Sequence, residues 1–388
     1  MIKRVESDGQ KIKILCFSWR GPGHPMAGGA EQVMHEHMKG WVEAGCEVTL
    51  FTSHFLSGFR QEIIDGVKII RRGRQILGVH IAAAWWYIFL RHEKYDLVVD
   101  QFHGIPFFTP LYVRVPKLAV VQEVARKVWF KNDLPWLLNY LIGILGYVSE
   151  PFIFKLYRSI QFLTGSQSAK DDLVRMGIKG DKITIIHHGV IIEKIKVPKK
   201  EKNPTVVFLG ALAKDKGIEE AIKAFSMLSK SGVFKFWIIG RGGESYVEKL
   251  KKMVRKKGID GSTKFWGFVS QKKKFELLAR AQVMINPSIL EGWGLVNIEA
   301  NAMGMPVVAY QSPGLVDSVS DGKSGILCKT NTVGEMVKEI ENLIQDREKY
   351  KRLQKGAKEW SNRFSWEQSK KESVKLISGL VRYKKYGT

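Results

Sequence analysis

The sequence predicts an α/β protein with two doubly wound domains that face a central cleft. Three observations indicate this class: short apolar runs alternate with segments of helical periodicity, the alternation occurs twice along the 388 residues, and a charged, proline-containing segment separates the two series. A chain of this length has room for two or three domains with sizeable cores. We expect domains over residues 1–195 and 205–365, a linker over 196–204, and a terminal helix over 366–388.

Strand-like runs in each half define the two predicted sheets. In the first half they are short apolar segments at residues 11–19, 47–53, 67–72, 96–101, 117–122, 160–166 and 183–190. An amphipathic helix is predicted over residues 31–43, because one stripe of this segment carries Met34, Met38, Trp41 and Val42. In the second half, runs of the same character occupy residues 205–210, 234–240, 263–269, 282–286 and 306–310.

A glycine-rich turn in the second half stands between two carboxylates, Glu291 and Glu299. The run 282–286 predicts a buried strand, and residues 295–303 predict the helix that follows it. Such a unit belongs to a parallel sheet, and ligands of open parallel sheets bind beyond the carboxyl ends of the strands. The loop 287–294 lies at that edge, so we expect both carboxylates to face the ligand crevice.

The start of this predicted helix is a candidate anion site. Backbone amides near Gly294, Leu295 and Val296 would lack intrahelical partners, and the helix dipole favours a phosphate there. Carboxylates beside a phosphate suggest recognition of sugar hydroxyls, because ionised carboxylates accept hydrogen bonds. The alternative on pattern alone is a solvated loop charge at Glu291 and a charge at Glu299 that serves the helix dipole.

Three further loops follow predicted strands. Gly28 and Gly29 precede the first helix and would let backbone amides approach a phosphate closely. Lys216 follows the first strand of the second domain and is a candidate phosphate ligand, while His103 follows the strand at 96–101. A flexible connector, a solvated lysine and a structural histidine are the alternatives at these places.

Composition and charge narrow the functional classes. The chain carries 62 Lys and Arg against 38 Asp and Glu, a net charge of +24 that favours anionic partners. No zinc-finger spacing or RNA-binding aromatic motif is present, so nucleic acid is suggested by charge alone. The N-terminus lacks the apolar core of a signal peptide, and Cys16, Cys46 and Cys328 lack disulfide or metal spacing. We therefore expect a cytoplasmic location.

In order and spacing, the loops of this sequence resemble the retaining, nucleotide-sugar-dependent glycosyltransferases of family four, which have the GT-B fold of two Rossmann-like domains. The resemblance extends over nearly the whole chain. Its most specific part is the pair Glu291 and Glu299 with the residues around it. The motifs that carry it are GGAE (28–31), KG (216–217), IIGRGGE (238–244), FWGFVS (265–270), PSILEGWGLVNIEA (287–300), GMPVVAY (304–310) and DGKSGILC (321–328).

The resemblance implies a role for each matching residue. The second domain would hold the nucleotide, with Glu299 on the ribose hydroxyls and Lys216 on the diphosphate. Glu291 would bind the transferred sugar, and the Gly28–Gly29 loop would contact the phosphate or the sugar from the first domain. His103 matches the histidine that these enzymes place beside the donor sugar.

The resemblance also implies the reaction: transfer of a hexosyl group from a UDP- or GDP-sugar, with retention of anomeric configuration and without a metal or other cofactor. The sequence agrees in having no Asp-x-Asp motif. The implied acceptor is a glycan or a lipid-linked molecule, and no nucleic acid takes part.

One position departs from the family pattern. Ala211 stands where the family usually has an arginine that contacts the diphosphate, and Arg241 in the neighbouring loop is the candidate to replace it. A charge-assisted hydrogen bond of this kind contributes roughly 1.5–3 kcal/mol. A non-catalytic homologue that only binds the nucleotide-sugar is therefore the alternative function.

Two aromatic-rich stretches of the first domain, residues 80–92 and 134–157, suggest a membrane surface. The longest uninterrupted apolar part, 141–148, is far shorter than the ~20 residues of a spanning helix, and Asn139, Glu150 and Pro151 interrupt the wider segment. Two interpretations stay open: a buried core helix, or a helix at headgroup level that is drawn to the anionic cytoplasmic face of a membrane.

Overall fold

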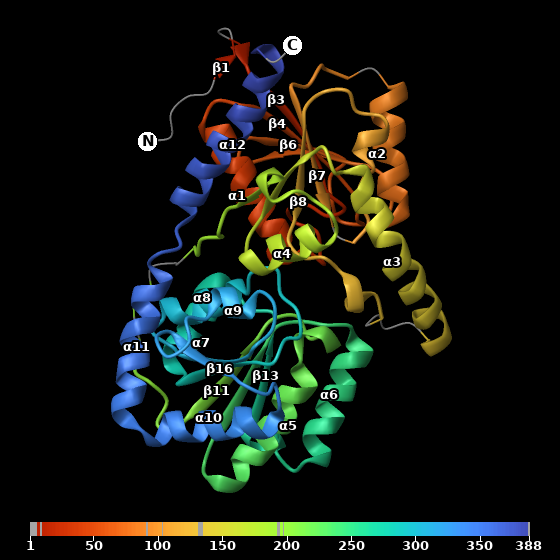
Figure 1. Ribbon diagram of the computed structural model, residues 1–388. Helices are drawn as coiled ribbons and strands as arrows, with labels where there is room; N and C mark the ends of the chain where they lie inside the picture. Colours follow the sequence, from red (N-terminus) through yellow and green to blue (C-terminus); the bar gives the residue numbers. More distant parts are fainter. Residues whose placement is uncertain are drawn as a thin grey trace. The chain divides into compact units, whose positions relative to one another are not determined.

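The chain divides into two compact units, each built on a mainly parallel sheet (Figure 1). The computed structural model describes residues 6–7, 10–90, 92–102, 104–130, 135–191, 195–196 and 198–386. The first unit comprises Met1–Gly189 with Trp366–Thr388, and the second comprises Val190–Ser365.

The segment between the two predicted domains belongs to the second unit. Val190 and Ile195, which the sequence analysis places at the end of the first domain, pack against the core of the second unit. Glu201 of the predicted linker is also bound there: its amide donates to the Arg280 carbonyl at 2.9 Å, and its carboxylate pairs with Lys235 at 3.1 Å. Apolar contacts and ion pairs thus hold residues that their charge and proline content assign to a linker.

The first unit contains an eight-stranded sheet in the order β10-β9-β8-β7-β3-β4-β6-β5. All neighbours are parallel except β5 and β6. The strands are β3 (Lys13–Phe17), β4 (Glu47–Thr52), β5 (Gln61–Ile64), β6 (Val67–Arg71), β7 (Leu97–Phe102), β8 (Lys117–Val121), β9 (Gln161–Thr164) and β10 (Ile183–Ile185). A separate hairpin pairs β1 (Glu6–Ser7) with β2 (Gln10–Lys11).

Helices cover both faces of this sheet, as in a doubly wound fold. Alternate strand residues separate the two faces: Ile14 packs with α1 and α12, whereas Leu15 packs with α2. The core beneath α3 and α4 includes Ala119 and lies on the same face as that beneath α2. The helices of this unit are α1 (Gly29–Glu43), α2 (Leu77–Phe89), α3 (Trp136–Leu156), α4 (Gln167–Arg175) and α12 (Trp366–Tyr386), and its 3-10 turns are η1 (Thr109–Leu111), η2 (Arg126–Phe130) and η3 (Gly180–Lys182).

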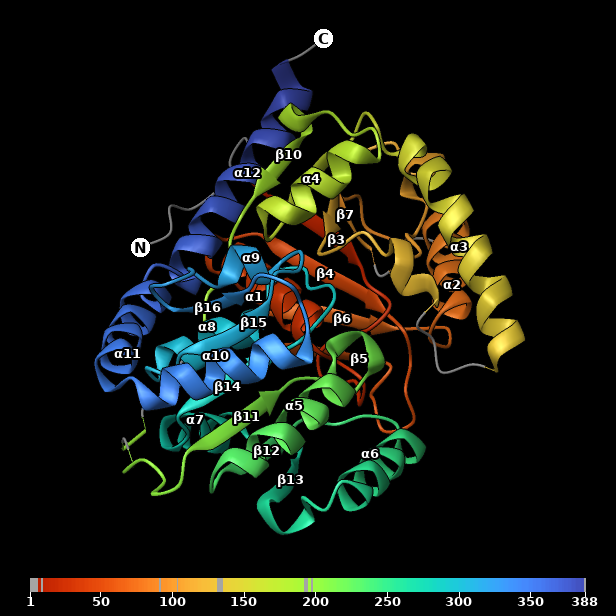
Figure 2. The same ribbon diagram turned by 60° about the horizontal axis from the view of Figure 1, so that its bottom comes forward.

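The second unit contains a six-stranded parallel sheet in the order β13-β12-β11-β14-β15-β16. In Figure 2, α5 and α10 lie together on one face of this sheet. The strands are β11 (Thr205–Leu209), β12 (Lys235–Ile239), β13 (Thr263–Gly267), β14 (Val283–Asn286), β15 (Val307–Tyr310) and β16 (Gly325–Cys328). The helices are α5 (Ile218–Ser231), α6 (Glu244–Lys256), α7 (Gln271–Arg280), α8 (Leu295–Ala302), α9 (Leu315–Ser318), α10 (Val333–Gln345) and α11 (Arg347–Ser361), with turns η4 (Lys214–Lys216) and η5 (Asp260–Ser262).

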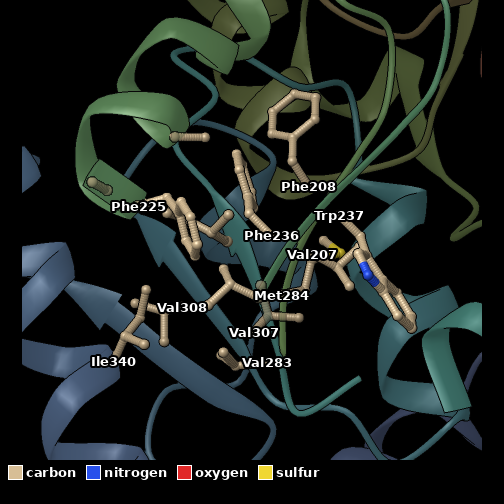
Figure 3. Close-up of a cluster of buried hydrophobic side chains, with 14 of the residues drawn as sticks. Val207, Phe208, Phe225, Phe236, Trp237, Val283, Met284, Val307, Val308 and Ile340 are labelled. Atoms are coloured by element: carbon tan, nitrogen blue, oxygen red, sulfur yellow. The ribbon is translucent and has the colours of Figure 1, made fainter. Parts of the chain in front are cut away.

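Figure 3 shows the core of the second unit, where central strands supply Val207, Met284 and Val308 while α5 and α10 supply Phe225 and Ile340. All these side chains are fully buried. All twelve predicted strands are confirmed. Most of them are buried on both faces, and such strands read as continuous apolar runs. The edge strands β5 and β16 were not predicted; β5 alternates exposed with half-buried positions and so lacks a continuous apolar run.

The helix α3 is a largely exposed apolar helix, so the interpretation as a buried core helix is wrong. Its buried residues form one stripe, Gly143, Gly146, Glu150 and Phe154. At Gly143 and Gly146, a Cβ atom would lie 2.3 Å from the rings of Phe130 and Trp129, so η2 packs directly on the helix backbone.

The helix α3 is continuous through Asn139, Glu150 and Pro151, the residues expected to interrupt the wider apolar segment. The buried Glu150 carboxylate accepts hydrogen bonds from the amides of Ala125 and Arg126, both at 2.9 Å, and is therefore satisfied inside the unit. With 21 residues, α3 is by length and composition able to cross a membrane.

The C-terminal helix α12 completes the core of the first unit. The indole of Trp41 in α1 donates to the Ser373 hydroxyl at 2.5 Å, and Lys370 pairs with Glu36 at 3.3 Å and Glu43 at 2.9 Å. Ile377 is fully buried in the same cluster as Trp41. The last helix of the chain thus packs on its first.

Two buried histidines lie where α12 meets α1. His37 is fully buried, and neither ring nitrogen has a hydrogen-bond partner among the described residues. Its ring lies 6.2 Å from that of His188 and 6.1 Å from that of Trp366. Burial, reinforced by the charge of Lys370, lowers the pKa of His37 to about 4. Burial also lowers the pKa of His188 well below its ordinary value.

We predict that the first unit loses stability as pH falls from 6.5 towards 4. Over this range the unfolded chain takes up a proton at His37 and the folded chain does not, so acid favours unfolding by about 2 kcal/mol at pH 5 for this one group. Thermal unfolding at pH 7.5 and pH 5 measures the difference. His37→Phe should show a smaller fall in melting temperature, whereas His54→Gln, at an exposed position, should match the wild type. Equal falls in all three proteins would contradict this account.

Candidate functional site

The strand order of the second sheet creates a site at its carboxyl edge. From β11 the chain proceeds to β12 and β13 on one side, and then returns to β14, β15 and β16 on the other. The strands β11 and β14 are parallel neighbours, with Val206 opposite Val283. The loops that follow them, 210–217 and 287–294, therefore emerge side by side at the point where open sheets bind ligands.

Hydrogen bonds join these two loops. The Ile289 amide donates to the Asp215 carbonyl at 3.0 Å, and the Ser288 hydroxyl donates to the same carbonyl at 3.3 Å. Lys216 Nζ donates to the Leu290 carbonyl at 3.2 Å and lies 3.2 Å from Glu291 Oε1. The structure thus brings together two predicted site residues that are far apart in sequence, each with about a fifth of its side chain exposed (22% and 20%).

Gly294 turns the second loop into α8. It is the N-cap of the helix with φ of 78° and ψ of 47°, a left-handed conformation that favours glycine. Leu295 and Val296 are the first helical residues, and amides at these positions have no partner within the helix. The structure thus has a helix N-terminus at the carboxyl edge of the sheet, which is the geometry predicted for an anion site.

A buried polar network fixes this turn, and the sequence analysis missed it. Asn286 at the end of β14 donates to the Asn297 side chain at 2.8 Å, and Asn297 donates to the Ser318 hydroxyl at 2.8 Å. All three side chains are buried. A satisfied network of this kind gives the start of α8 one defined orientation.

Glu299 lies inside the unit rather than in solvent, with only 5% of its surface exposed. Its carboxylate contacts Lys274 of α7 at 2.5 Å. Burial raises the pKa of Glu299, and the ammonium group of Lys274 opposes that rise. The alternative of a charge that only serves the helix dipole does not account for this burial or for the pairing of Glu299 with Lys274. Lys274 was missed as a site residue, because in sequence it is one of three consecutive lysines.

Arg241 lies beside the loop that contains Ala211. The Leu212 amide donates to the Arg241 carbonyl at 2.8 Å, so the loops after β11 and β12 are joined next to Ala211. The Arg241 guanidinium stacks on the exposed ring of Phe268, 4.8 Å from its centre. The backbone thus places Arg241 in the neighbourhood predicted for it, while its side chain lies on an aromatic ring.

In the first unit, the strand order also reverses, between β3 and β7. The Gly28 amide donates to the Glu31 carboxylate at 2.7 Å, which caps α1, and Gly29 is the first residue of that helix. His103 lies outside the described residues. The loop after β7 depends on Asp100, which the sequence analysis missed: its buried carboxylate accepts hydrogen bonds from Tyr157 at 2.6 Å and Thr109 at 2.8 Å.

Comparison with known proteins places this architecture in a family. Residues 27–194 match the model of glycosyltransferase family 4, and residues 191–360 match that of glycosyl transferases group 1. The chain belongs to glycosyltransferase family four. An uncharacterized glycosyltransferase of Methanocaldococcus jannaschii is 29% identical to this glycosyltransferase. The alignment covers 96% of this chain and 100% of the relative.

Solved structures show the same GT-B fold of two Rossmann-like domains. Sucrose-phosphate synthase from Thermosynechococcus elongatus superposes with a TM-score of 0.79 at 16% identity, covering 97% of this glycosyltransferase and all of that chain. WaaG, a glycosyltransferase involved in lipopolysaccharide biosynthesis, gives 0.74 at 16% identity, with 95% and 100% covered. HepE of Anabaena, solved with UDP and glucose, gives 0.71 at 18% identity, with 95% and 100% covered.

The ion pair between Lys274 and Glu299 generates a prediction for this glycosyltransferase. In Lys274→Met, burial acts on Glu299 without an opposing charge, so the carboxyl pKa should rise further. A protonated carboxyl accepts fewer hydrogen bonds, and nucleotide binding should weaken about tenfold at pH 6 and recover as pH increases. Isothermal titration with UDP and GDP from pH 6 to pH 9 tests this.

Lys273→Met is the matched control, because Lys273 is the preceding residue of α7 and pairs with Glu276 at 3.5 Å instead. It should keep the pH dependence of the wild type. The same pH dependence in the Lys274 variant would show that Lys274 does not govern the ionisation of Glu299.

Proposed function

We propose that this glycosyltransferase moves a hexosyl group from a UDP- or GDP-sugar to a hydroxyl of a glycan or lipid-linked acceptor, with retention of anomeric configuration. The observation that carries the proposal is the 3.2 Å contact between Lys216 and Glu291, formed where two loops meet beside the start of α8. A cation, a carboxylate and helix amides at one point suit the junction of a diphosphate with a sugar.

Each side chain of the site has a proposed role in holding the donor. Glu299 accepts hydrogen bonds from the ribose hydroxyls, and Lys274 opposes its protonation. Lys216 and the amides of Leu295 and Val296 bind the diphosphate. Glu291 accepts hydrogen bonds from hydroxyls of the transferred sugar and so orients it.

In the proposed reaction, the bond between the anomeric carbon and the diphosphate oxygen breaks, and its electron pair stays with that oxygen. The acceptor oxygen bonds to the same face of the anomeric carbon, while its proton passes to the diphosphate. Lys216 and the helix amides stabilise the charge that develops on the leaving group, an electrostatic contribution. The resemblance assigns no metal or other cofactor to these steps. His103 and the Gly28–Gly29 loop are proposed to contact the donor from the first domain.

Known relatives support the donor class. HepE has been solved with UDP and with UDP-glucose, and it shares the fold of this chain at 18% identity. Ala211 favours one alternative, a non-catalytic homologue that binds the nucleotide-sugar, because the cation usual at this position is missing. The stacking of Arg241 on Phe268 agrees with that alternative as long as the guanidinium remains there.

We also propose that the protein works at the cytoplasmic face of a membrane, with α2 and α3 on the lipid surface. The two helices lie on the same flank of the first unit in both views (Figures 1 and 2). Their exposed side chains are large and apolar, including Trp85 (58%), Phe89 (63%), Trp136 (80%), Tyr140 (57%) and Leu145 (70%). Amphipathic aromatic side chains of this kind favour the headgroup region of a bilayer.

Topology supports docking rather than spanning. The helix α3 connects β8 to β9, which are parallel, hydrogen-bonded neighbours, so both of its ends return to one sheet. At 1.5 Å per residue it is about 32 Å long, about twice the length of a five-residue strand, and therefore extends past the sheet. Neither helix exposes an acidic side chain, because Glu150 is buried, and the net charge of +24 favours anionic lipid.

The donor site is tested by two substitutions with different expected effects. Glu299→Ala should weaken UDP or GDP binding at least tenfold, because hydrogen bonds to a charged acceptor contribute about 1.5–3 kcal/mol. Glu291→Ala should leave nucleotide affinity unchanged and lower turnover. Isothermal titration measures binding, and release of sugar from a panel of UDP- and GDP-sugars measures turnover.

Glu299→Gln, which keeps one acceptor oxygen, should fall between the wild type and Glu299→Ala. Unchanged affinity in a folded Glu299→Ala protein would remove the ribose assignment. Tight nucleotide binding by the wild type without sugar release or transfer to any native lipid extract would favour the non-catalytic homologue.

Membrane docking is tested by co-sedimentation with vesicles of increasing anionic lipid content. The wild type should bind at low salt, and Leu141→Glu with Leu145→Glu should abolish binding, because both positions are exposed on α3. Val233→Glu, at an exposed apolar position of the second unit, is the matched control and should bind like the wild type. A wild type that stays in the supernatant would overturn the proposal, as would a vesicle-independent dimer that only the double variant disrupts.

A further inference from the structure

A cavity of about 550 Å³ opens in the first unit, and arginines line most of it. Its walls include Arg60, Arg71, Arg72 and Arg74, together with His54 and Gln61. His54 follows β4 and Arg72 follows β6, so the cavity lies at the carboxyl edge of the first sheet. This edge corresponds to the ligand-binding edge of open α/β sheets.

Backbone hydrogen bonds hold the walls of the cavity in place. The His54 amide donates to the Gly73 carbonyl at 2.9 Å, and the Arg71 amide donates to the Arg60 carbonyl at 2.9 Å. Three separate chain segments therefore present their side chains from a fixed frame. A backbone that is already ordered leaves only the arginine side chains to lose entropy when a ligand binds.

The arginines of the cavity differ in burial and in ion pairing. Arg71 is buried, pairs with Glu62, and donates to the carbonyls of Phe59 at 3.0 Å and Pro22 at 2.8 Å. By contrast, no described carboxylate pairs with Arg60, Arg72 or Arg74, which are all exposed. Three like charges around one cavity repel one another, and a bound anion would offset this repulsion.

Guanidinium groups are suited to one class of anion. Each presents a planar fork of donors that matches two phosphate oxygens at once, and such charge-assisted pairs are stronger than neutral hydrogen bonds. A cavity of this size also exceeds the needs of a single inorganic ion, since small-molecule sites begin near 300 Å³.

The surroundings of the cavity point to the acceptor. Through Pro22, Arg71 contacts the loop that leads from β3 to Gly28 and α1. On the other side, α2 begins at Leu77, three residues after Arg74, and its exposed apolar residues include Leu77 and Ile81. A phosphate group held here would have the glycine loop on one side and an apolar helix on the other.

We propose that this cavity binds a phosphate or diphosphate group of the acceptor, so that the acceptor is a phosphate-bearing molecule. The proposal rests on the transfer function proposed above and adds the chemical class of its second substrate. Arg60, Arg72 and Arg74 bind the phosphate oxygens, and Arg71 holds the wall against the glycine loop. The phosphate belongs either to a lipid carrier or to a soluble sugar phosphate, and the chemistry recognised is the same.

The experiment uses the full chain saturated with UDP, so that the donor site does not compete for phosphate. Glucose 6-phosphate is titrated in one arm, and phosphatidylcholine vesicles that contain a polyprenyl phosphate are added in the other, both at physiological salt. The wild type should bind at least one probe, and Arg72→Gln with Arg74→Gln should weaken that binding at least tenfold. The single substitution Arg60→Gln, at an exposed position, should also weaken binding of the probe.

Arg114→Gln is the matched control, because Arg114 is exposed and precedes β8, at the opposite edge of the sheet. It should bind both probes like the wild type, and all variants should keep the UDP affinity and melting temperature of the wild type. A wild type that binds neither probe would overturn the proposal, as would arginine variants that bind like the wild type. If the wild type does not bind UDP, the proposed transfer function is overturned instead.

Discussion

Parallel pairing of β11 with β14 brings together two loops that lie more than seventy residues apart, and every other property of the candidate site depends on that contact. The chain proceeds from β11 to β12 on one side and later to β14 on the other, so the loops after β11 and β14 emerge next to each other at the carboxyl edge of the sheet. Side chains of the two loops therefore meet there, with Lys216 Nζ 3.2 Å from Glu291 Oε1. The Asp215 carbonyl accepts hydrogen bonds from both Ile289 and Ser288 and so fixes the two loops against each other.

Each of the two carboxylates at the candidate site pairs with a lysine, but the two pairs differ in burial. A carboxylate at 5% exposure would be costly to ionise alone, and the ammonium group of Lys274 offsets part of that cost. Lys216 and Glu291 form a second pair that is more exposed and therefore easier to separate when a ligand enters. The unit thus holds one carboxylate in a fixed position and leaves the other able to exchange partners.

The sequence was informative about elements and loops because buried parallel strands produce continuous apolar runs and glycines mark the turns after them. It was less informative about partners. Lys274 is one of three adjacent lysines, and only the crossing of α7 with α8 singles it out. Asn297 looks like an ordinary helical residue until β14 and Ser318 surround it. The exposure of α3 could not be predicted either, since an apolar helix has the same composition whether a core or solvent surrounds it.

The position of α12 has a consequence for how the protein is made. Ile377 belongs to the same core cluster as Ile14 and Trp41, so the first unit lacks part of its interior until α12 has been synthesised. The second unit is one continuous segment, Val190–Ser365, and has all its strands as soon as that segment leaves the ribosome. Domains commonly fold in order from the N-terminus during translation. Here we expect the reverse order, with the second unit folded while the first unit still waits for α12.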